Sequence, residues 1–122
     1  MILHESMEMY LETILILKER LHNVRAIDIA KQMNFSKPTV SIALKKLKEN
    51  DYVDINDHNN YVTLTEKGLA IANNIYDKHK TLTDFLVSIG VSKENAANDA
   101  CKIEHDISEE TFLCIKKYLK QD

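Results

Sequence analysis

Glycine and proline are scarce in this chain, and their scarcity limits the folds that it can adopt. The 122 residues include two glycines and one proline. A sandwich or barrel of many short strands needs turn-forming residues between most of its strands, so these folds are disfavoured. Hydrophobic residues make up 44% of the chain, which is enough to bury a core. The sequence therefore predicts a mainly α-helical protein, organised as one ordinary domain or two small modules.

Neither a membrane segment nor an export signal is evident. No apolar run approaches the roughly 18 residues that a membrane-spanning helix needs, and the N-terminus lacks the basic and apolar segments of a signal peptide. The two cysteines, Cys101 and Cys114, are too few for a disulfide framework and suit a reducing compartment. We therefore expect a cytoplasmic protein with no membrane partner.

The charges are unevenly distributed along the chain. The net charge is −3, but residues 25–50 carry six basic and two acidic side chains, a net +4, so the other residues sum to −7. A basic segment on an acidic protein indicates a local surface for anions. The alternative is a solvated helix face that has no partner.

Hydrophobic periodicity and capping residues predict the order of the elements. Ser36, Thr65, Ser92 and Ser108 are the expected helix N-caps. Helices are expected over about 5–20, 26–33, from Ser36 to residue 50, from Thr65 to Gly90, over about 93–106, and from Ser108 onwards. In the helix over 26–33, Ile27, Ala30 and Met33 are expected to lie on one side. Two strands, Tyr52–Ile55 and Tyr61–Leu64, are expected to flank a turn and form a hairpin.

A short helix, a tight turn, a polar-capped helix and a hairpin follow one another in the order of a winged helix-turn-helix. The first residues of the second helix of such a motif point at base edges in the major groove. The residues expected to contact DNA are Arg25, Lys31, Ser36, Lys37, Pro38, Thr39, Ser41, Ile42, Lys45, Lys46, His58, Asn59 and Asn60. Because no Arg, Asn or Gln begins this helix, we expect modest direct base readout and a contribution from DNA shape. The alternative is a winged helix that serves only protein contacts.

A metal-ligand pattern lies in the segment NDACKIEHDIS. Cys101, Glu104 and His105 are at positions i, i+3 and i+4 of an expected helix, so their side chains share one face. A thiol, a carboxylate and an imidazole together form a ligand set for first-row metals. Further ligands are offered by Met9 and Glu12 on the first helix and by His79 on the long fourth helix. The alternatives are a buried structural cysteine, a core methionine and surface acids and histidines, and we expect Cys114 to lie in the core.

Five segments of the sequence carry a resemblance to a known family. They are SMEMYLETI, IDIAKQMNFSKPTVSIALKKLKENDYV, LTEKG, KHKTLTDFL and NDACKIEHDIS. Together they resemble the diphtheria toxin repressor and manganese transport regulator family, from about Glu5 to Leu119. The resemblance implies a winged helix-turn-helix over residues 1–70, followed by a helical metal-binding and dimerisation domain over residues 71–122. It further implies a homodimer, and we expect the two-domain form without the SH3-like domain that some members add.

The resemblance also bears on which metal is bound. Manganese-sensing members are similar at the acidic and histidine ligands, but have carboxylates where this chain has Met9 and Cys101. Iron-sensing members share these two residues, but place a Glu at the position of Thr83 and a His at the position of Ala97 in a second site. The set thus resembles the primary site of the iron sensors. The second site is in question, because both of these ligands are absent here. Glu12, which the iron sensors lack, offers a partial replacement for them. Thioether and thiolate ligands are softer than carboxylates, so we favour Fe(II), with Mn(II) as the alternative.

These observations predict a metal-dependent homodimeric repressor that binds palindromic operators in double-stranded DNA and controls metal-uptake genes. One alternative is a metal-independent winged-helix regulator, in which the cysteine, glutamate and histidine pattern is incidental. Another is a metalloenzyme or thiol hydrolase that uses Cys101 and His105. Because we find no oxyanion-hole loop, glycine-rich phosphate loop or substrate cleft in the sequence, we expect neither enzymatic activity nor a small-molecule substrate.

Overall fold

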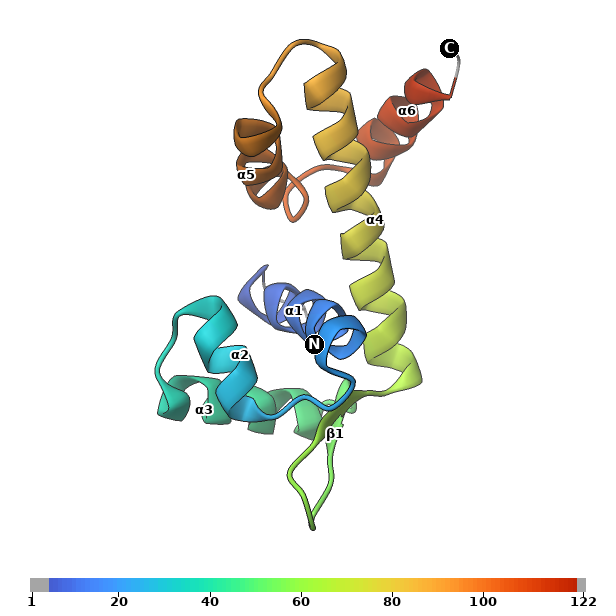
Figure 1. Cartoon of the computed structure of the whole chain (residues 1–122). Helices are drawn as coiled ribbons and strands as arrows, with labels where there is room; N and C mark the ends of the chain where they lie inside the picture. The colour runs from blue at the N-terminus through green and yellow to red at the C-terminus, as the bar shows by residue number, and fades with distance from the viewer. Residues whose placement is uncertain (1–4, 121–122) are drawn as a thin grey trace. The chain divides into compact units, whose positions relative to one another are not determined.

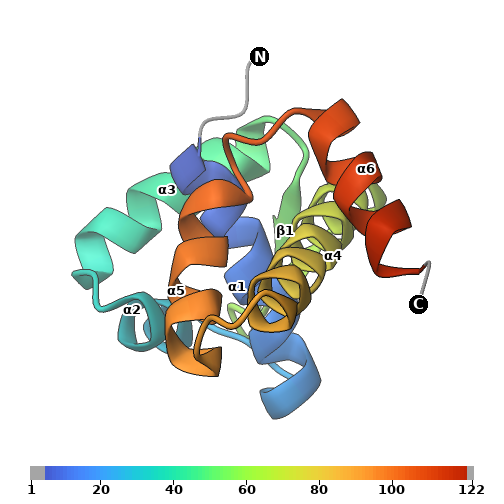
Figure 2. The ribbon, with the colours of Figure 1, turned by 90° about the horizontal axis from the view of Figure 1, so that it is seen from above.

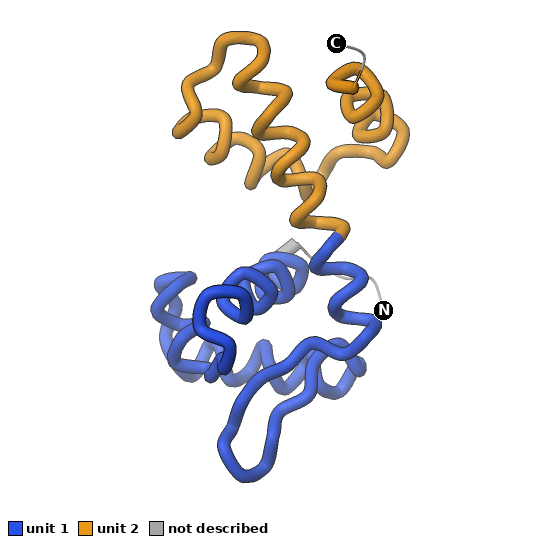
Figure 3. Tube along the Cα trace, turned by 45° about the vertical axis from the view of Figure 1, so that its right-hand side comes forward, with its two compact units in different colours: residues 1–73 blue, residues 74–122 orange. Residues whose placement is uncertain are grey.

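The computed structural model describes residues 5–120 and consists of two compact units (Figure 1). The first unit comprises Met1–Asn73 and the second Asn74–Asp122, as coloured in Figure 3. The expected domain limit after residue 70 falls inside the long helix α4 (Glu66–Ser88), which begins in the first unit and ends in the second. Within the described part of the chain, no helix is both long enough and apolar enough to span a membrane.

The first unit is a three-helix core with a hairpin. Helix α1 (Glu5–Leu21) packs on α2 (Ala26–Met33), and α2 packs on α3 (Lys37–Glu49), as Figure 2 shows from above. Strands β1 (Val53–Ile55) and β2 (Val62–Leu64) then pair antiparallel, with Val53 opposite Leu64. The segment before α2 joins this hairpin, because the amide of Val62 donates to the carbonyl of Val24 at 2.7 Å. This arrangement confirms the expected winged helix-turn-helix.

The tight turn between α2 and α3 follows from two local features. Asn34 ends α2 in the left-handed conformation, with a φ of 57°, which asparagine tolerates better than most residues. Ser36 then caps α3, because its hydroxyl accepts from the amide of Thr39 at 3.2 Å. Pro38 lies in the first turn of α3, where a missing amide hydrogen costs nothing.

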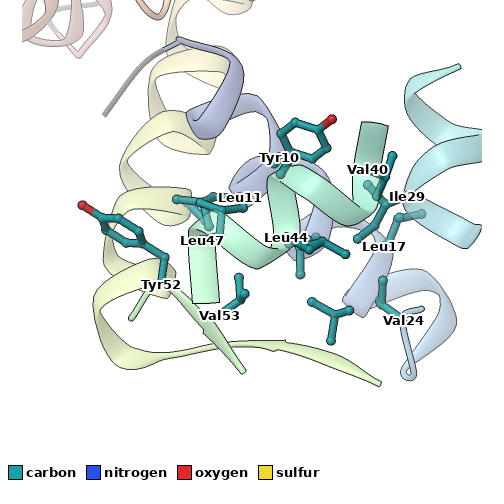
Figure 4. Close-up of a cluster of buried hydrophobic side chains, with 14 of the residues drawn as sticks. Tyr10, Leu11, Leu17, Val24, Ile29, Val40, Leu44, Leu47, Tyr52 and Val53 are labelled. Carbon is teal, nitrogen blue, oxygen red and sulfur yellow. The ribbon is translucent and has the colours of Figure 1, made fainter. Parts of the chain in front are cut away.

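Apolar side chains from every element of the first unit meet in one core (Figure 4). On α3 the inward residues are Val40, Leu44 and Leu47, as the helical periodicity predicts. They pack with apolar residues of α1, α2 and the hairpin, including Leu11, Leu17, Val24, Ile29 and Val53. The basic residues of α3 consequently face solvent.

The structure corrects one residue of the expected inner face of α2, since Ala30 is buried and Met33 packs against the core as expected, but Ile27 does not. Ile29 and Ala30 are the buried residues of this helix, while Ile27 is 41% exposed. An eight-residue helix has barely two turns, so its periodicity alone does not distinguish two adjacent apolar stripes. The packing of α2 on both α1 and α3 selects the stripe that contains Ile29.

The second unit is built from the last part of α4, α5 (Lys93–Ile103) and α6 (Glu109–Leu119). Helices α5 and α6 lie on opposite sides of α4 in Figures 1 and 2. Lys116 of α6 donates to Asp77 of α4 at 2.7 Å, and the rings of Phe85 and Tyr118 meet edge to face. Ser92 and Ser108 cap their helices as expected, each accepting from the amide three residues later.

Two expectations about the second unit are wrong in detail. Helix α5 ends at Ile103, three residues earlier than expected, so Glu104 is its C-cap and His105 lies in the turn that follows. Cys114 is exposed rather than buried. It lies two residues from the buried Phe112, a separation that places a side chain on nearly the opposite side of an α-helix.

The start of α4 depends on a glycine. A Cβ atom on Gly68 would lie 2.0 Å from the carbonyl oxygen of Tyr52, which is backbone and cannot move aside cheaply. Around this contact, the Thr65 hydroxyl donates to the Asp51 carbonyl at 2.7 Å, and Lys67 donates to the Asn50 carbonyl at 3.1 Å. Only glycine therefore allows α4 to begin so close to the end of α3.

We predict that Gly68→Ala destabilises the protein by roughly 1–3 kcal/mol or more, because the added methyl group forces the backbone apart. The measurement is the free energy of unfolding of the metal-free protein in urea. The matched control is Gly90→Ala, which meets no atom within 4 Å but has a φ of 106°, so it should cost only the backbone strain, about 1–2 kcal/mol. An effect of Gly68→Ala no larger than that of the control would contradict the proposed close contact.

Candidate metal centre and DNA-binding surface

Three potential metal ligands converge in the second unit. His79 projects from α4, Cys101 from α5, and Glu104 from the end of α5. The Nδ1 atom of His79, the Sγ atom of Cys101 and a carboxylate oxygen of Glu104 all lie within 4.8 Å of one another. The imidazole is 2.9 Å from Glu104 Oε2 and 3.8 Å from Cys101 Sγ. The three donors therefore surround a common point between two helices.

Glu104 is the most deeply buried member of this group, with 1% of its surface exposed. A buried carboxylate is strongly disfavoured unless other groups stabilise its charge. Here Oε2 is hydrogen bonded to Nδ1 of His79 at 2.9 Å, and Oε1 lies 3.3 Å from Nε2 of His105. Glu104 thus links the two histidines, although His105 lies beyond the end of the helix.

The electrostatics of the group favour a positive charge at its centre. Hydrogen bonds to Cys101 and Glu104 raise the pKa of His79 to about 10, although burial opposes the shift. In the metal-free protein, the imidazole is therefore protonated at neutral pH and supplies a cation between the thiol and the carboxylate. A metal that bound Nδ1 would displace this proton, so metal affinity should increase with pH.

The donor set fits a divalent transition metal. A thiolate, an imidazole and a carboxylate suit iron, cobalt, nickel or zinc better than magnesium or calcium, which prefer oxygen ligands alone. His105 adds a second imidazole beside the group. The other two expected ligands, Met9 and Glu12, lie on α1 in the first unit, where Glu12 is buried and Met9 is 38% exposed.

The residues expected to contact DNA all belong to the first unit. Those of α3 and its cap are all exposed, as are Arg25, which caps α2, and Lys31 in its last turn. The hydroxyls of Ser36 and Thr39 are 2.7 Å apart and hydrogen bonded to each other. At the hairpin tip, the side chain of Asn56 accepts from the amides of His58 and Asn59. Both parts are therefore held in shape by local hydrogen bonds.

One residue beside this surface was missed by the sequence analysis. Tyr61, directly before β2, lies under the guanidinium of Arg25, with 5.0 Å between Cζ and the ring centroid. Cations lie favourably over the faces of aromatic rings. The two residues are 36 positions apart, and no periodicity or motif in the sequence connects them. The bridge between Val24 and Val62, their respective neighbours, brings them together.

The comparison with known protein families now identifies the chain. Residues 2–60 match the N-terminal DNA-binding domain of iron-dependent repressors, and residues 65–121 match their metal-binding and dimerisation domain. The chain belongs to the iron-dependent repressor family. The resemblance found in the sequence is thereby confirmed, as is the mainly helical fold with a DNA-binding unit before a metal-binding one. This is a family of metal-dependent transcriptional repressors that bind DNA and dimerise.

Curated relatives are similar over nearly the whole chain. The uncharacterized HTH-type transcriptional regulator MJ0568 of Methanocaldococcus jannaschii is 37% identical over 119 residues, which cover 96% of this chain and 94% of that protein. The transcriptional regulator MntR of Escherichia coli O6:H1 is 34% identical over 117 residues, covering 96% of this chain and 75% of that protein. Both relatives are described as regulators of transcription.

Solved structures share the fold. The manganese regulator SloR has a TM-score of 0.82 at 29% identity, with 100% of this chain and 56% of that chain covered. IdeR of T. acidophilum has a TM-score of 0.80 at 26% identity, with 94% of this chain and 54% of that chain covered. The chain thus spans about half the length of these two solved proteins.

The raised pKa of His79 predicts how pH changes the stability of the metal-free protein. The protonated imidazole stabilises the folded state fully below its ordinary pKa of 6.5, and this contribution is lost as the pH rises through about 10. The difference in unfolding free energy between the wild-type chain and His79→Gln should therefore shrink from pH 6.5 to pH 10. Urea unfolding with a chelator present, at several pH values, measures it. A difference that stays constant over this range would show that His79 does not hold the proton.

Proposed function

We propose that this chain is a metal-gated homodimeric repressor that binds palindromic operators and controls metal-uptake genes. The observation that carries the proposal is the convergence of His79, Cys101 and Glu104 in the unit that matches a metal-binding and dimerisation domain. The exposed basic helix α3, in the unit that matches a DNA-binding domain, supports the DNA part of the proposal.

The proposed ligand set combines residues of both units. Its members are Met9, Glu12, His79, Cys101, Glu104 and His105. A bound divalent cation would supply positive charge and directional coordination to these donors. Because Met9 and Glu12 belong to α1 of the DNA-binding unit, ligation by all six residues would tie this unit to the dimerisation unit. In a dimer, that tie would set the distance between the two copies of α3, which a palindrome with a defined spacing requires.

The energy needed for this gating is within the range of a metal site. Converting a mostly inactive population into a mostly active one takes a difference in metal affinity worth roughly 5 kcal/mol. Structural zinc sites in small proteins reach about 10 kcal/mol or more. By linkage, operator DNA must tighten metal binding by the same factor by which the metal tightens DNA binding. Equal metal affinity with and without DNA would contradict the gating mechanism.

Fe(II) is the metal that we favour. The thioether of Met9 and the thiolate of Cys101 are softer ligands than the carboxylates of manganese-type sites, and they shift preference away from Mn(II). The solved relatives include a manganese regulator, SloR, so Mn(II) is the competing metal to test.

We predict that Met9→Glu/Cys101→Glu shifts the preference between Fe(II) and Mn(II) towards Mn(II) by about tenfold or more, because two soft ligands become hard oxygen donors. Anaerobic competition titrations of the wild-type chain and the variant, with both metals present, measure this ratio. Much stronger activation of the wild-type chain by Mn(II) than by Fe(II) would instead make manganese the metal that is sensed.

The DNA function is tested by anaerobic selection from a random duplex pool, with Fe(II), with Mn(II) and with a chelator. The proposal expects enrichment of a palindrome only when metal is present. The same enrichment with chelator would support a metal-independent regulator instead. Failure to enrich any sequence in all three conditions would contradict the DNA-binding function.

We further predict that Glu104→Ala abolishes the dependence of DNA affinity on metal, because it removes the carboxylate between the two histidines. The measurement is DNA affinity with and without Fe(II). Glu110→Ala is a suitable control, since this residue is an exposed acid of the same unit, on α6, and no proposed ligand. A metal response of Glu104→Ala equal to that of the control would place the metal elsewhere.

A further inference from the structure

A groove crosses the first unit between the start of α2, the start of α3 and the hairpin. It has a volume of about 460 Å³. Arg25, Lys37, Ser41 and Asn60 contribute polar groups to its lining, while Ile27 and Ile55 contribute apolar surface. The groove thus combines two positive charges, a hydroxyl and an amide with an apolar floor. It lies beside the base-reading end of α3.

The charge of the groove is uncompensated by acids within its lining. None of its lining residues is acidic. The nearest acid in sequence, Asp28, accepts from the backbone amide of Arg25 at 2.9 Å, as part of the cap of α2. Asp54 and Asp57 belong to the hairpin but do not line the groove. Two cations with no acid among the lining residues favour an anionic ligand.

The apolar floor distinguishes between anions. Ile27 is 41% exposed, although an isoleucine is usually buried. A free inorganic phosphate would leave this surface uncovered. A sugar–phosphate step of DNA offers both a charged phosphate and the C–H groups of deoxyribose, which match the cations and the isoleucines respectively.

Tyr61 holds the Arg25 side chain at the edge of this groove. The guanidinium lies over the ring of Tyr61 at 5.0 Å. The backbone of both residues is held by hydrogen bonds, since Val62 donates to Val24 at 2.7 Å and Tyr61 donates to the Asn59 side chain at 3.0 Å. A guanidinium keeps its N–H donors in its own plane, so stacking on a ring leaves them available to a phosphate.

We propose that Tyr61 is a positioning residue, which orients the Arg25 guanidinium at this groove towards a phosphate of the DNA backbone. The inference rests on the proposed function for its ligand, duplex DNA. It adds a side-chain contact between the hairpin and the N-cap of α2, which lies across the groove from the start of α3. Because backbone contacts carry no base identity, it affects all DNA sequences alike.

The test uses the full metal-loaded chain and measures affinity for duplex DNA over a series of salt concentrations. Each phosphate contact contributes about 0.9 to the steepness of log affinity plotted against log salt. At roughly 0.15 M salt, one such contact increases the affinity by about fivefold. Arg25→Gln should therefore make the slope shallower by about 0.9 for each subunit bound. It should also weaken the DNA affinity by about fivefold for each subunit, on operator and random DNA alike. Arg20→Gln is the matched control, because Arg20 is exposed on α1 and does not line the groove; it should leave both values unchanged.

The positioning role is tested with Tyr61→Leu and Tyr61→Phe. The phenylalanine variant keeps the ring face and should bind DNA like the wild-type chain. The leucine variant should weaken binding, but it should add nothing when combined with Arg25→Gln, because both changes disable the same contact. Additive losses in the double variant would overturn the role of Tyr61. Unfolding measurements on each variant separate these effects from damage to the hairpin.

The identity of the ligand is tested on the DNA itself. Single phosphates of the DNA are replaced by uncharged methylphosphonates. At one position in each half-site, this replacement should weaken DNA binding by the wild-type chain but not by Arg25→Gln. The absence of any such position would overturn the proposal. Saturable binding of inorganic phosphate at Arg25 and Lys37, with DNA affinity unaffected by Arg25→Gln, would overturn it in favour of a free-phosphate site. If the wild-type chain binds no DNA under any metal condition, the proposed function itself fails, which is a separate outcome.

Discussion

The buried carboxylate of Glu104 is the constraint on which the second unit depends. A charge in this environment must be balanced, and the protonated imidazole of His79 on another helix balances it, while His105 in the adjoining turn lies 3.3 Å from the other oxygen. The His79–Glu104 contact joins α4 to the end of α5, and the thiol of Cys101 lies beside the same imidazole. A structure that must neutralise one acid therefore also assembles a set of metal ligands.

The first unit solves a different problem, which is to present a basic helix while keeping its apolar side buried. The core residues of α3 face α1, α2 and the hairpin, so its lysines and its capped first turn face solvent. The close approach of α4 to Tyr52 at Gly68 anchors the base of the hairpin. The hairpin in turn contacts the segment before α2, and through Tyr61 it places a cation beside α3. The first unit thus presents cations from both α3 and the segment before α2 on its exposed surface.

Most of the fold was predictable because it depends on local signals. Ser36, Ser92 and Ser108 cap helices where the sequence places them, and the periodicity of α3 selects its buried face. The errors arose where local signals are weak or absent. The two turns of α2 allow two apolar faces. Whether Cys114 is buried or exposed depends on how α6 packs, which the sequence of α6 alone does not determine. The early end of α5 leaves the contact between Glu104 and His105 intact, because both residues still follow Cys101 closely.

The sequence by itself determined the mainly helical class, the order of the winged helix-turn-helix and the residue types of the metal ligands, because spacing, caps and side-chain chemistry are properties of short segments. Only the tertiary structure decided that His79 meets Cys101 and Glu104, since these residues are 22 and 25 positions away from it. It also decided that Arg25 lies over Tyr61, through a bridge between Val24 and Val62. Contacts between distant segments depend on how helices and strands pack, and no local pattern encodes that packing.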